Sequence, residues 1–128
     1  MFERKEIAKG FVAGMAGGAI IDLIFIQFGG PSALFSLLGI TIRQEVFFAH
    51  VFLGGILGIL FLIFIAKASS TNLWLAGEIW SLICMTAVGG IPALFYYPSF
   101  PDFKIIGLAL FVWSLYGVIL VIARKKFK

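Results

Sequence analysis

Four long apolar runs dominate the chain, and short stretches with polar residues, glycine and proline separate them. A helix needs about 20 apolar residues to cross the hydrocarbon core of a bilayer, and each run is long enough. Strands of a membrane barrel would be about ten residues long with strictly alternating polarity, which the runs lack. The pattern predicts one all-α membrane domain over residues 1–128, a four-helix transmembrane bundle with spans near 7–28, 45–66, 73–96 and 105–123.

The segments between the runs predict how the helices are connected. Gly29-Gly30-Pro31 is a strong breaker that ends the first helix. Apolar residues recur at helical spacing in the stretch that follows, so residues 32–43 predict a short helix lying in the membrane interface. The polar loop after Lys67 is short, which predicts that the second and third helices are antiparallel neighbours.

A breaker also falls inside the third apolar run, at Gly89-Gly90-Ile91-Pro92. Proline lacks an N–H and clashes with the carbonyl four residues earlier, which belongs to Val88. Gly89, Gly90 and Pro92 therefore predict a kink in the third helix. Broken backbone at membrane depth is tolerated where protein or a cavity covers it, and broken helices mark substrate sites in transporters.

Composition and charge agree with a membrane protein and indicate its orientation. The chain is 62% hydrophobic and 12% charged, whereas soluble domains are about half apolar and a quarter charged. The net charge of +4 does not indicate a nucleic-acid partner, because the basic residues gather beside the ends of the spans. The positive-inside rule then predicts a multi-pass plasma-membrane protein with both termini in the cytoplasm. The residues on that side are Arg4, Lys5, Lys9, Lys67, Arg124, Lys125, Lys126 and Lys128. Arg43, Glu45, Asp102 and Lys104 are expected at the outer surface, where water hydrates them.

The first two helices each carry a stripe of glycines that ends in an ionisable residue. Residues four apart share a helix face, and glycines at this spacing let helices approach closely in lipid. Antiparallel alignment of the stripes pairs Asp22 with His50, Gly18 with Gly54, and Gly14 with Gly58. The ionisable pair would lie roughly 10 Å inside the outer end of each helix.

The Asp22–His50 pair has two interpretations. An unpaired carboxylate at this depth is unfavourable, and a charge-assisted hydrogen bond to imidazole would make a structural pair that fixes the helix register. The alternative is a functional site: a proton relay, an ion path or a metal ligand. Glu45 is a third, weak metal candidate, but these residues do not fill a coordination shell alone. No cofactor is predicted.

Glu78 and Tyr116 fall at similar depths in the inner halves of the third and fourth helices. Glu78 is either a carboxylate near the interface, hydrated or paired with a basic residue such as Lys67, or the inner part of a proton path. In that second interpretation Asp22 and His50 would form the outer part. The two halves of the chain are also a candidate tandem repeat, in which Gly58 corresponds to Gly117.

Catalytic patterns such as a nucleophile–base pair or HExxH are missing, so the chain is not expected to be an enzyme by itself. We therefore expect a small accessory subunit of a larger membrane complex, which contacts lipids and other membrane subunits through faces rich in its 15 phenylalanines. The alternative is a small homo-oligomeric transporter or channel for protons, ions or metals that uses Asp22 and His50.

Overall fold

The computed structural model describes residues 3–28, 33–67, 72–96 and 103–126; most of these residues are helical, and no strand occurs among them. Four helical runs are long and apolar enough to cross a membrane. This confirms the predicted fold class, and the runs lie within a few residues of the predicted spans. They are α1 (Arg4–Phe28), α3 (Arg43–Lys67), the run Leu73–Tyr96, and α6 (Phe103–Lys126). The predicted break at 29–31 lies outside the described residues.

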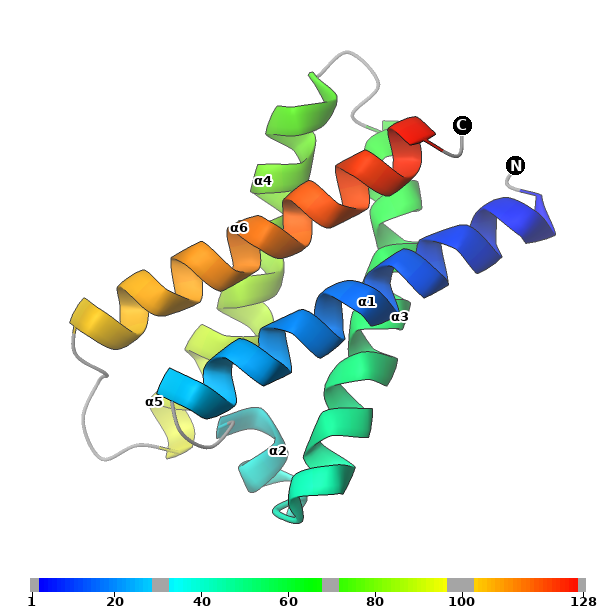
Figure 1. The fold of residues 1–128 in the computed structure, drawn as a ribbon. Helices are drawn as coiled ribbons and strands as arrows, with labels where there is room; N and C mark the ends of the chain where they lie inside the picture. Colours follow the sequence, from blue (N-terminus) through cyan, green and yellow to red (C-terminus); the bar gives the residue numbers. More distant parts are fainter. Residues whose placement is uncertain (1–2, 29–32, 68–71, 97–102, 127–128) are drawn as a thin grey trace.

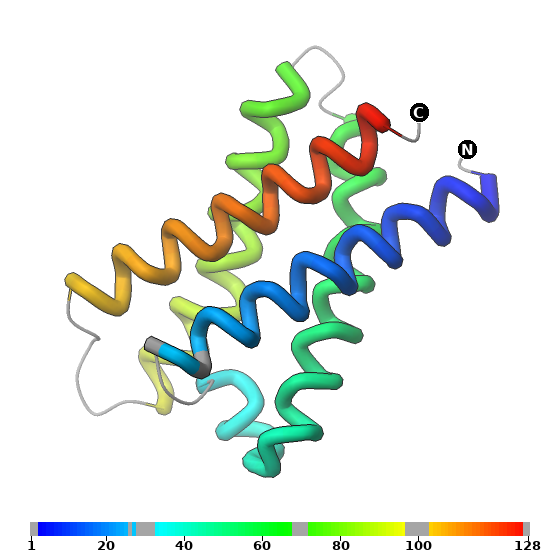
Figure 2. The backbone as a smooth tube through the Cα atoms, in the orientation of Figure 1, coloured from blue at the N-terminus to red at the C-terminus, as the bar shows by residue number. Residues whose placement is uncertain are grey.

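The long helices form two crossed layers (Figure 1). α1 and α6 lie side by side and antiparallel in one layer, and α3 and α4 (Leu73–Cys84) form the other (Figure 2). α1 contacts both α3 and α6, and α6 also contacts α4. α3 and α4 are antiparallel, as the short loop predicts, but they touch each other much less than α1 and α6 do. The contact between α1 and α6, the first and last helices of the chain, is therefore more extensive than the contact between α3 and α4.

Glycines allow the close crossing of α1 and α3. A Cβ atom at Gly14 would collide with the carbonyl oxygen of Gly54, and one at Gly54 would collide with that of Gly14. A Cβ at Gly58 would likewise collide with the carbonyl of Gly10 and lie 2.9 Å from Cα of Gly14. Gly54 and Gly58 of α3 therefore each lie between two α1 glycines, whereas Gly55 faces Phe11 and Met15. The sequence analysis instead placed each glycine directly opposite one glycine of the other helix. In the structure the two stripes are shifted by about two residues, so that the glycines interlock.

α4 and α6 cross in an equivalent way. A Cβ at Gly117 would lie 2.6 Å from the carbonyl oxygen of Gly77 and 3.2 Å from Cβ of Ser81. Gly54 meets Gly14 and Gly18 in the same manner at the first crossing. All three correspondences have one offset of 63 residues, which matches 14 with 77, 18 with 81 and 54 with 117.

Sequence identities continue this offset along both helix pairs. Within α1 and α4, two further positions are identical, Ala13 with Ala76 and Ile20 with Ile83. Within α3 and α6 the identical positions include Phe48 with Phe111, Ile56 with Ile119, Leu57 with Leu120 and Ile59 with Ile122. Contacts and sequence thus agree on a two-helix repeat. Its register corrects the expected one, since Gly117 corresponds to Gly54 and not to Gly58.

The two halves contact each other through α1 and α6 and through α3 and α4. These two contacts differ because the side chain at one equivalent position differs in size. A Cβ atom at Gly17 of α1 would collide with the ring of Tyr116 from α6. Glycine at this position therefore leaves room for the ring. The position equivalent to Gly17 on α4 is Trp80, whose indole lies against Phe61 and Phe64 of α3 at centroid distances of 6.4 and 5.3 Å. A bulky indole in place of glycine keeps α4 and α3 further apart.

α2 (Ala33–Leu37) is shorter than the helix predicted over residues 32–43. Gly39 adopts a φ of +80°, its N–H donates to the Ser36 carbonyl, and the Ile40 N–H donates to the Phe35 carbonyl. These bonds form a Schellman ending, for which glycine is favoured. α2 is not only an interfacial helix, because Phe35 is buried and α2 contacts α5 (Ile91–Tyr96).

Between α4 and α5 the third span contains a π-helical segment, η1 (Met85–Gly90). The Ile91 N–H donates to the Thr86 carbonyl, five residues back. The segment includes Gly89 and Gly90 and ends just before Pro92, where the sequence predicts a break. Single π-helical turns inside α-helices are often found at functional sites. A change in helix direction at these residues stays a prediction.

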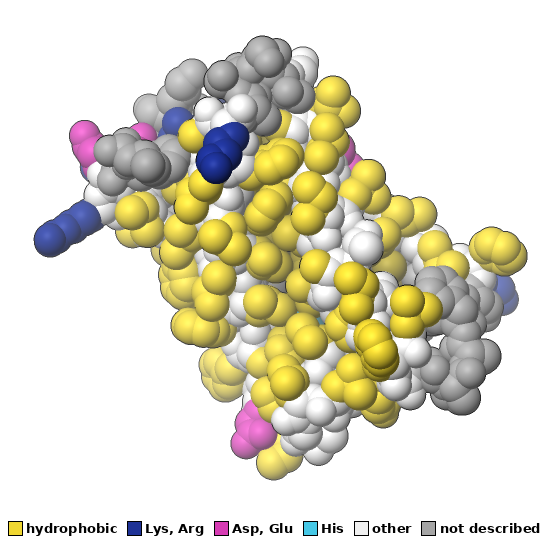
Figure 3. Space-filling model, turned by 180° about the vertical axis from the view of Figure 1, so that it is seen from behind, with side chains coloured by type: hydrophobic (Ala, Val, Ile, Leu, Met, Phe, Trp, Pro, Cys, Tyr) yellow, Lys and Arg dark blue, Asp and Glu magenta, His cyan; other side chains and the backbone are white. Residues whose placement is uncertain are grey.

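The outer surface of the bundle is apolar. Figure 3 shows hydrophobic side chains over most of the face seen from behind, with charged side chains at its margins. Large side chains are exposed on every long helix, and they include Val12, Phe48, Phe52, Leu75, Leu94 and Phe111. This distribution suits contact with lipid or with other apolar helices.

Candidate functional site

Asp22 is the centre of a buried ionic cluster at the end of the bundle where α2 lies. Its side chain is 3% exposed. Nη2 of Arg43 lies 2.5 Å from Oδ2 of Asp22, and Nδ1 of His50 lies 2.7 Å from Oδ1. The structure thus brings Asp22 and His50 together, and it adds Arg43. Each carboxylate oxygen has its own nitrogen partner, so the buried charge is compensated by direct hydrogen bonds.

Arg43 is the member of this cluster that the sequence analysis missed. It was expected at the outer surface, fully hydrated, but as the first residue of α3 its side chain reaches back to α1. The side chain is 39% exposed, yet Nη1 is buried and has no hydrogen-bond partner among the described residues. A signal was present, because Arg43 and His50 are seven residues apart and share one face of the helix.

α1 and α2 hold the imidazole of His50 in place. Phe35 of α2 meets the His50 ring edge-on, with centroids 4.7 Å apart and an interplanar angle of 85°. A Cβ at Gly18 would collide with the His50 carbonyl, so α1 passes directly beside the His50 backbone. The His50 side chain is 15% exposed. With its proton on Nδ1, the ring donates to Asp22.

The site does not resemble a metal centre. In the part of the chain that the structure describes, no three His, Cys, Asp or Glu side chains gather closely enough to hold a metal ion. Glu45 is exposed in the first turn of α3. The guanidinium of Arg43 occupies the second oxygen of Asp22, where a cation would need to bind. The arrangement therefore suits a fixed ion cluster, or a proton exchanged between its members.

Glu78 and Tyr116 lie in separate contacts. Glu78 accepts a hydrogen bond of 2.8 Å from Oγ of Ser114, which links α4 to α6. Within the described residues Glu78 forms no ion pair with Lys67. The hydroxyl of Tyr116 donates instead to the carbonyl of Gly54, at 2.6 Å, and the side chain is fully buried. Ser114 was not predicted, because a single serine in an apolar helix gives no sign of its partner.

Each of these polar contacts occurs in one half of the repeat and has no polar counterpart at the equivalent positions of the other half. At an offset of 63, the positions of Asp22, Arg43 and His50 correspond to Met85, Ile106 and Trp113 in the second half. The positions of Glu78 and Ser114 correspond in the same way to Met15 and Val51 in the first half. The two halves therefore share their helix crossings and differ in their chemistry.

Comparison with protein-family models, with curated proteins and with solved structures found no match to this chain.

Proposed function

We propose that this chain is a small accessory subunit of a larger integral membrane complex, in which its apolar outer faces contact lipids and neighbouring helices. The observation that carries the proposal is the internal pairing of three polar side chains in its spans. Asp22 is bonded by Arg43 and His50, Glu78 by Ser114, and Tyr116 by a backbone carbonyl. Groups satisfied in this way stabilise a bundle and leave few polar contacts for a permeating substrate.

The distribution of charges supports a proposed orientation in the membrane. The end where α1 begins and α6 ends carries most of the cations that the structure describes, and we place it in the cytoplasm of a plasma-membrane protein. Cysteine labelling tests this. In a Cys84→Ser background, a cysteine at Lys126 should react with an impermeant maleimide only after the cells are lysed, and one at Lys104 should react in intact cells. The reverse pattern would overturn the orientation.

The first experiment for the subunit proposal is native mass spectrometry of the protein extracted from its own membranes in mild detergent. A fixed ratio with other polypeptides supports the proposal. Recovery of the chain alone, or only with copies of itself, overturns it. The variant Phe48→Ala removes a side chain that is 67% exposed, and it should weaken the complex while leaving the chain folded.

A second candidate function, a proton- or ion-coupled transporter, is favoured by one observation. A buried carboxylate bonded to both guanidinium and imidazole at membrane depth is a common arrangement for proton exchange. In liposomes, this candidate predicts flux that Asp22→Asn abolishes while the fold and oligomer persist. A protein whose complex survives Asp22→Asn, and which conducts nothing, is a subunit and not a transporter.

A further inference from the structure

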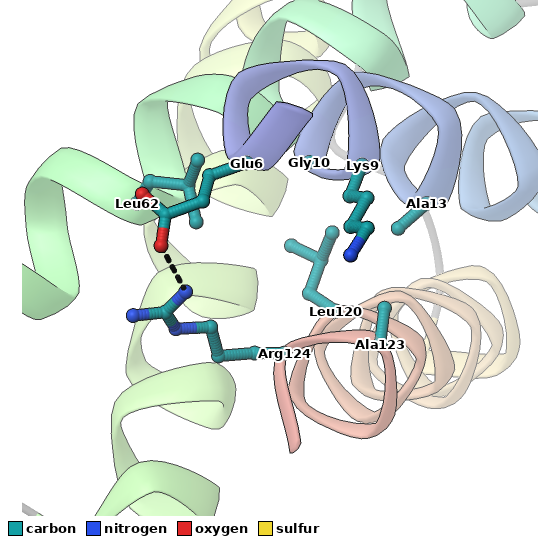
Figure 4. A pocket seen from close by; sticks show the side chains of 8 residues that line it. All are labelled: Glu6, Lys9, Gly10, Ala13, Leu62, Leu120, Ala123 and Arg124. Atoms are coloured by element: carbon teal, nitrogen blue, oxygen red, sulfur yellow. Dashed lines mark ion pairs between the residues drawn. The ribbon is translucent and has the colours of Figure 1, made fainter. Parts of the chain in front are cut away.

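A pocket opens between α1, α3 and α6 at the end of the molecule where both termini lie (Figure 4). It is separate from the Asp22 cluster, which lies at the opposite ends of α1 and α3. Its lining combines charged side chains with small and apolar ones. The lining residues are Glu6, Lys9, Gly10, Ala13, Leu62, Leu120, Ala123 and Arg124.

The pocket exists because small residues face each other there. Ala13 of α1 and Ala123 of α6 line the gap between the two helices, and neither fills it (Figure 4). Gly10 faces α3, where an added Cβ would lie 3.1 Å from Cδ1 of Leu62. Leu62 and Leu120 supply the apolar part of the lining. The enclosed space is small, about 20 Å³, and both charged and apolar side chains border it.

The mouth of the pocket is cationic. Lys9 and Arg124 line it together with one acid, Glu6. Nη1 of Arg124 lies 3.6 Å from Oε1 of Glu6, which is an ion pair but is longer than a hydrogen bond. More cations flank this end, among them Lys125, whose ammonium lies 4.8 Å from the centre of the Trp74 ring. A ligand with negative charge is favoured here.

The repeat shows that these charges are particular to this pocket. At the equivalent contact between α4 and α3, the position of Arg124 is taken by Phe61 and that of Lys9 by Asn72. The position of Ala123 is taken by Leu60. The second contact therefore lacks both the cations and the small residue, so the cationic pocket is not a general product of the helix crossing.

We propose that the cations of this pocket bind the phosphate of an anionic phospholipid. The enclosed space is about 20 Å³, enough for one phosphate oxygen, so the acyl chains would lie outside it, along the exposed apolar side chains of the neighbouring helices. A guanidinium binds phosphate oxygens through two parallel hydrogen bonds, and a lysine adds a point charge. Basic pockets between transmembrane helices at the membrane surface are typical sites for acidic headgroups. A lipid matches both the cations of the pocket and the exposed apolar side chains beside it, such as Ile7, Val12 and Ile122, whereas a soluble anion matches only the cations.

Glu6 gives the proposal a test with opposite signs. Without lipid, the Glu6 carboxylate forms an ion pair with Arg124. The same carboxylate would repel a bound phosphate. Glu6→Gln should therefore tighten lipid binding, and Arg124→Gln should weaken it. A pocket that served only as an internal ion pair would lose stability in both variants and would show no opposite effects on lipid binding.

The experiment is native mass spectrometry of the full chain in detergent, titrated with phosphatidylglycerol or phosphatidylcholine. We expect a clear preference for phosphatidylglycerol, a loss of about fivefold in affinity for Arg124→Gln and for Lys9→Gln, and a gain for Glu6→Gln. Lys67→Gln is the matched control, because Lys67 is an exposed cation that does not line the pocket. It should change the affinity by less than twofold.

Three outcomes would overturn the proposal. Equal binding of both lipids would remove the need for an anionic headgroup. An equal loss for Lys67→Gln and Arg124→Gln would show only general surface charge. Displacement of the lipid by inorganic phosphate at similar concentration would assign the pocket to a soluble anion. Circular dichroism of each variant checks that the helices remain folded. This proposal does not depend on whether the chain is a subunit or a transporter.

Discussion

The guanidinium of Arg43 and the carboxylate of Asp22 lie 2.5 Å apart, although 21 residues separate them in the chain. This contact joins the start of α3 to α1 across the segment that contains α2. His50 bonds the other oxygen of this carboxylate. Asp22 is therefore bound by two α3 residues that lie two helical turns apart. The cluster thus fixes the register of α1 on α3 and ties the first residue of α3 to α1.

Arg43→Gln should destabilise the protein, because it leaves a buried carboxylate with one charged partner fewer. We expect a loss of about 1–3 kcal/mol in the free energy of unfolding, below the value for a fully buried pair because the Arg43 side chain is 39% exposed. Reversible unfolding in mixed detergent micelles, followed by circular dichroism, measures it.

The control for this prediction is Lys104→Gln, which removes an exposed cation from the first turn of α6. It should leave stability unchanged. In the double variant Asp22→Asn with Arg43→Gln, the two losses should not add, and the coupling free energy should be about 0.5–3 kcal/mol. Additive losses would show that the contact does not hold the helices together.

Gly14→Ala should disrupt the crossing of α1 and α3, because the new methyl group would meet the Gly54 carbonyl. Overpacking of this kind costs about 1–3 kcal/mol. Gly107→Ala is the matched variant, since an added Cβ there meets nothing within 4 Å and alanine favours the helix by about 0.5–1 kcal/mol. Thermal unfolding in detergent should show opposite shifts, and shifts of the same sign would contradict the close crossing.

Tyr116→Phe should keep the ring beside Gly17 and remove the donor to the Gly54 carbonyl. We expect a loss of about 0.5–1.5 kcal/mol, the usual contribution of one hydrogen bond. Tyr116→Ala should cost about 3–5 kcal/mol, because it also empties a fully buried volume. If the two variants were equally stable, the packing of the ring would contribute nothing, and the account of the α1–α6 contact would be wrong.

Pro92→Ala tests the predicted kink in the third span. Alanine would restore an N–H where η1 gives way to α5, and the helix should straighten. Spin labels at Trp74 and Phe95, which are both exposed, report the end-to-end distance of the span in a Cys84→Ser background. The distance should be longer in Pro92→Ala. An unchanged distance would show that proline does not bend this helix.

The spans were predictable because long apolar runs leave little freedom in a bilayer. The layer arrangement was not predictable in the same way. The short loop correctly predicted that α3 and α4 are antiparallel, but their contact is limited by the indole of Trp80, whereas Gly17 lets α6 approach α1. One glycine and one tryptophan decide this, and their effect depends on which helices meet.

Two of the three members of the candidate site were predictable. Spacing aligned Asp22 with His50, since each lies on a glycine stripe at the same distance from its glycines, although the two stripes interlock about two residues away from the predicted pairing. Arg43 was assigned to water because it lies outside the apolar run, although its spacing of seven residues from His50 places both residues on one face of α3. A long side chain at a helix end can turn toward water or toward the bundle. Its direction depends on whether a neighbouring helix offers a partner, as Asp22 of α1 does for Arg43.

A circularly permuted protein that begins at α4 and ends at α3 should keep every helix in its present direction. Each half enters and leaves at one end of the molecule, as the ion pair between Glu6 and Arg124 and the contact of Lys125 with Trp74 show. A short linker would join the present termini there. Because a half contributes an even number of spans, rearranging the order of the halves would not invert the protein in the membrane.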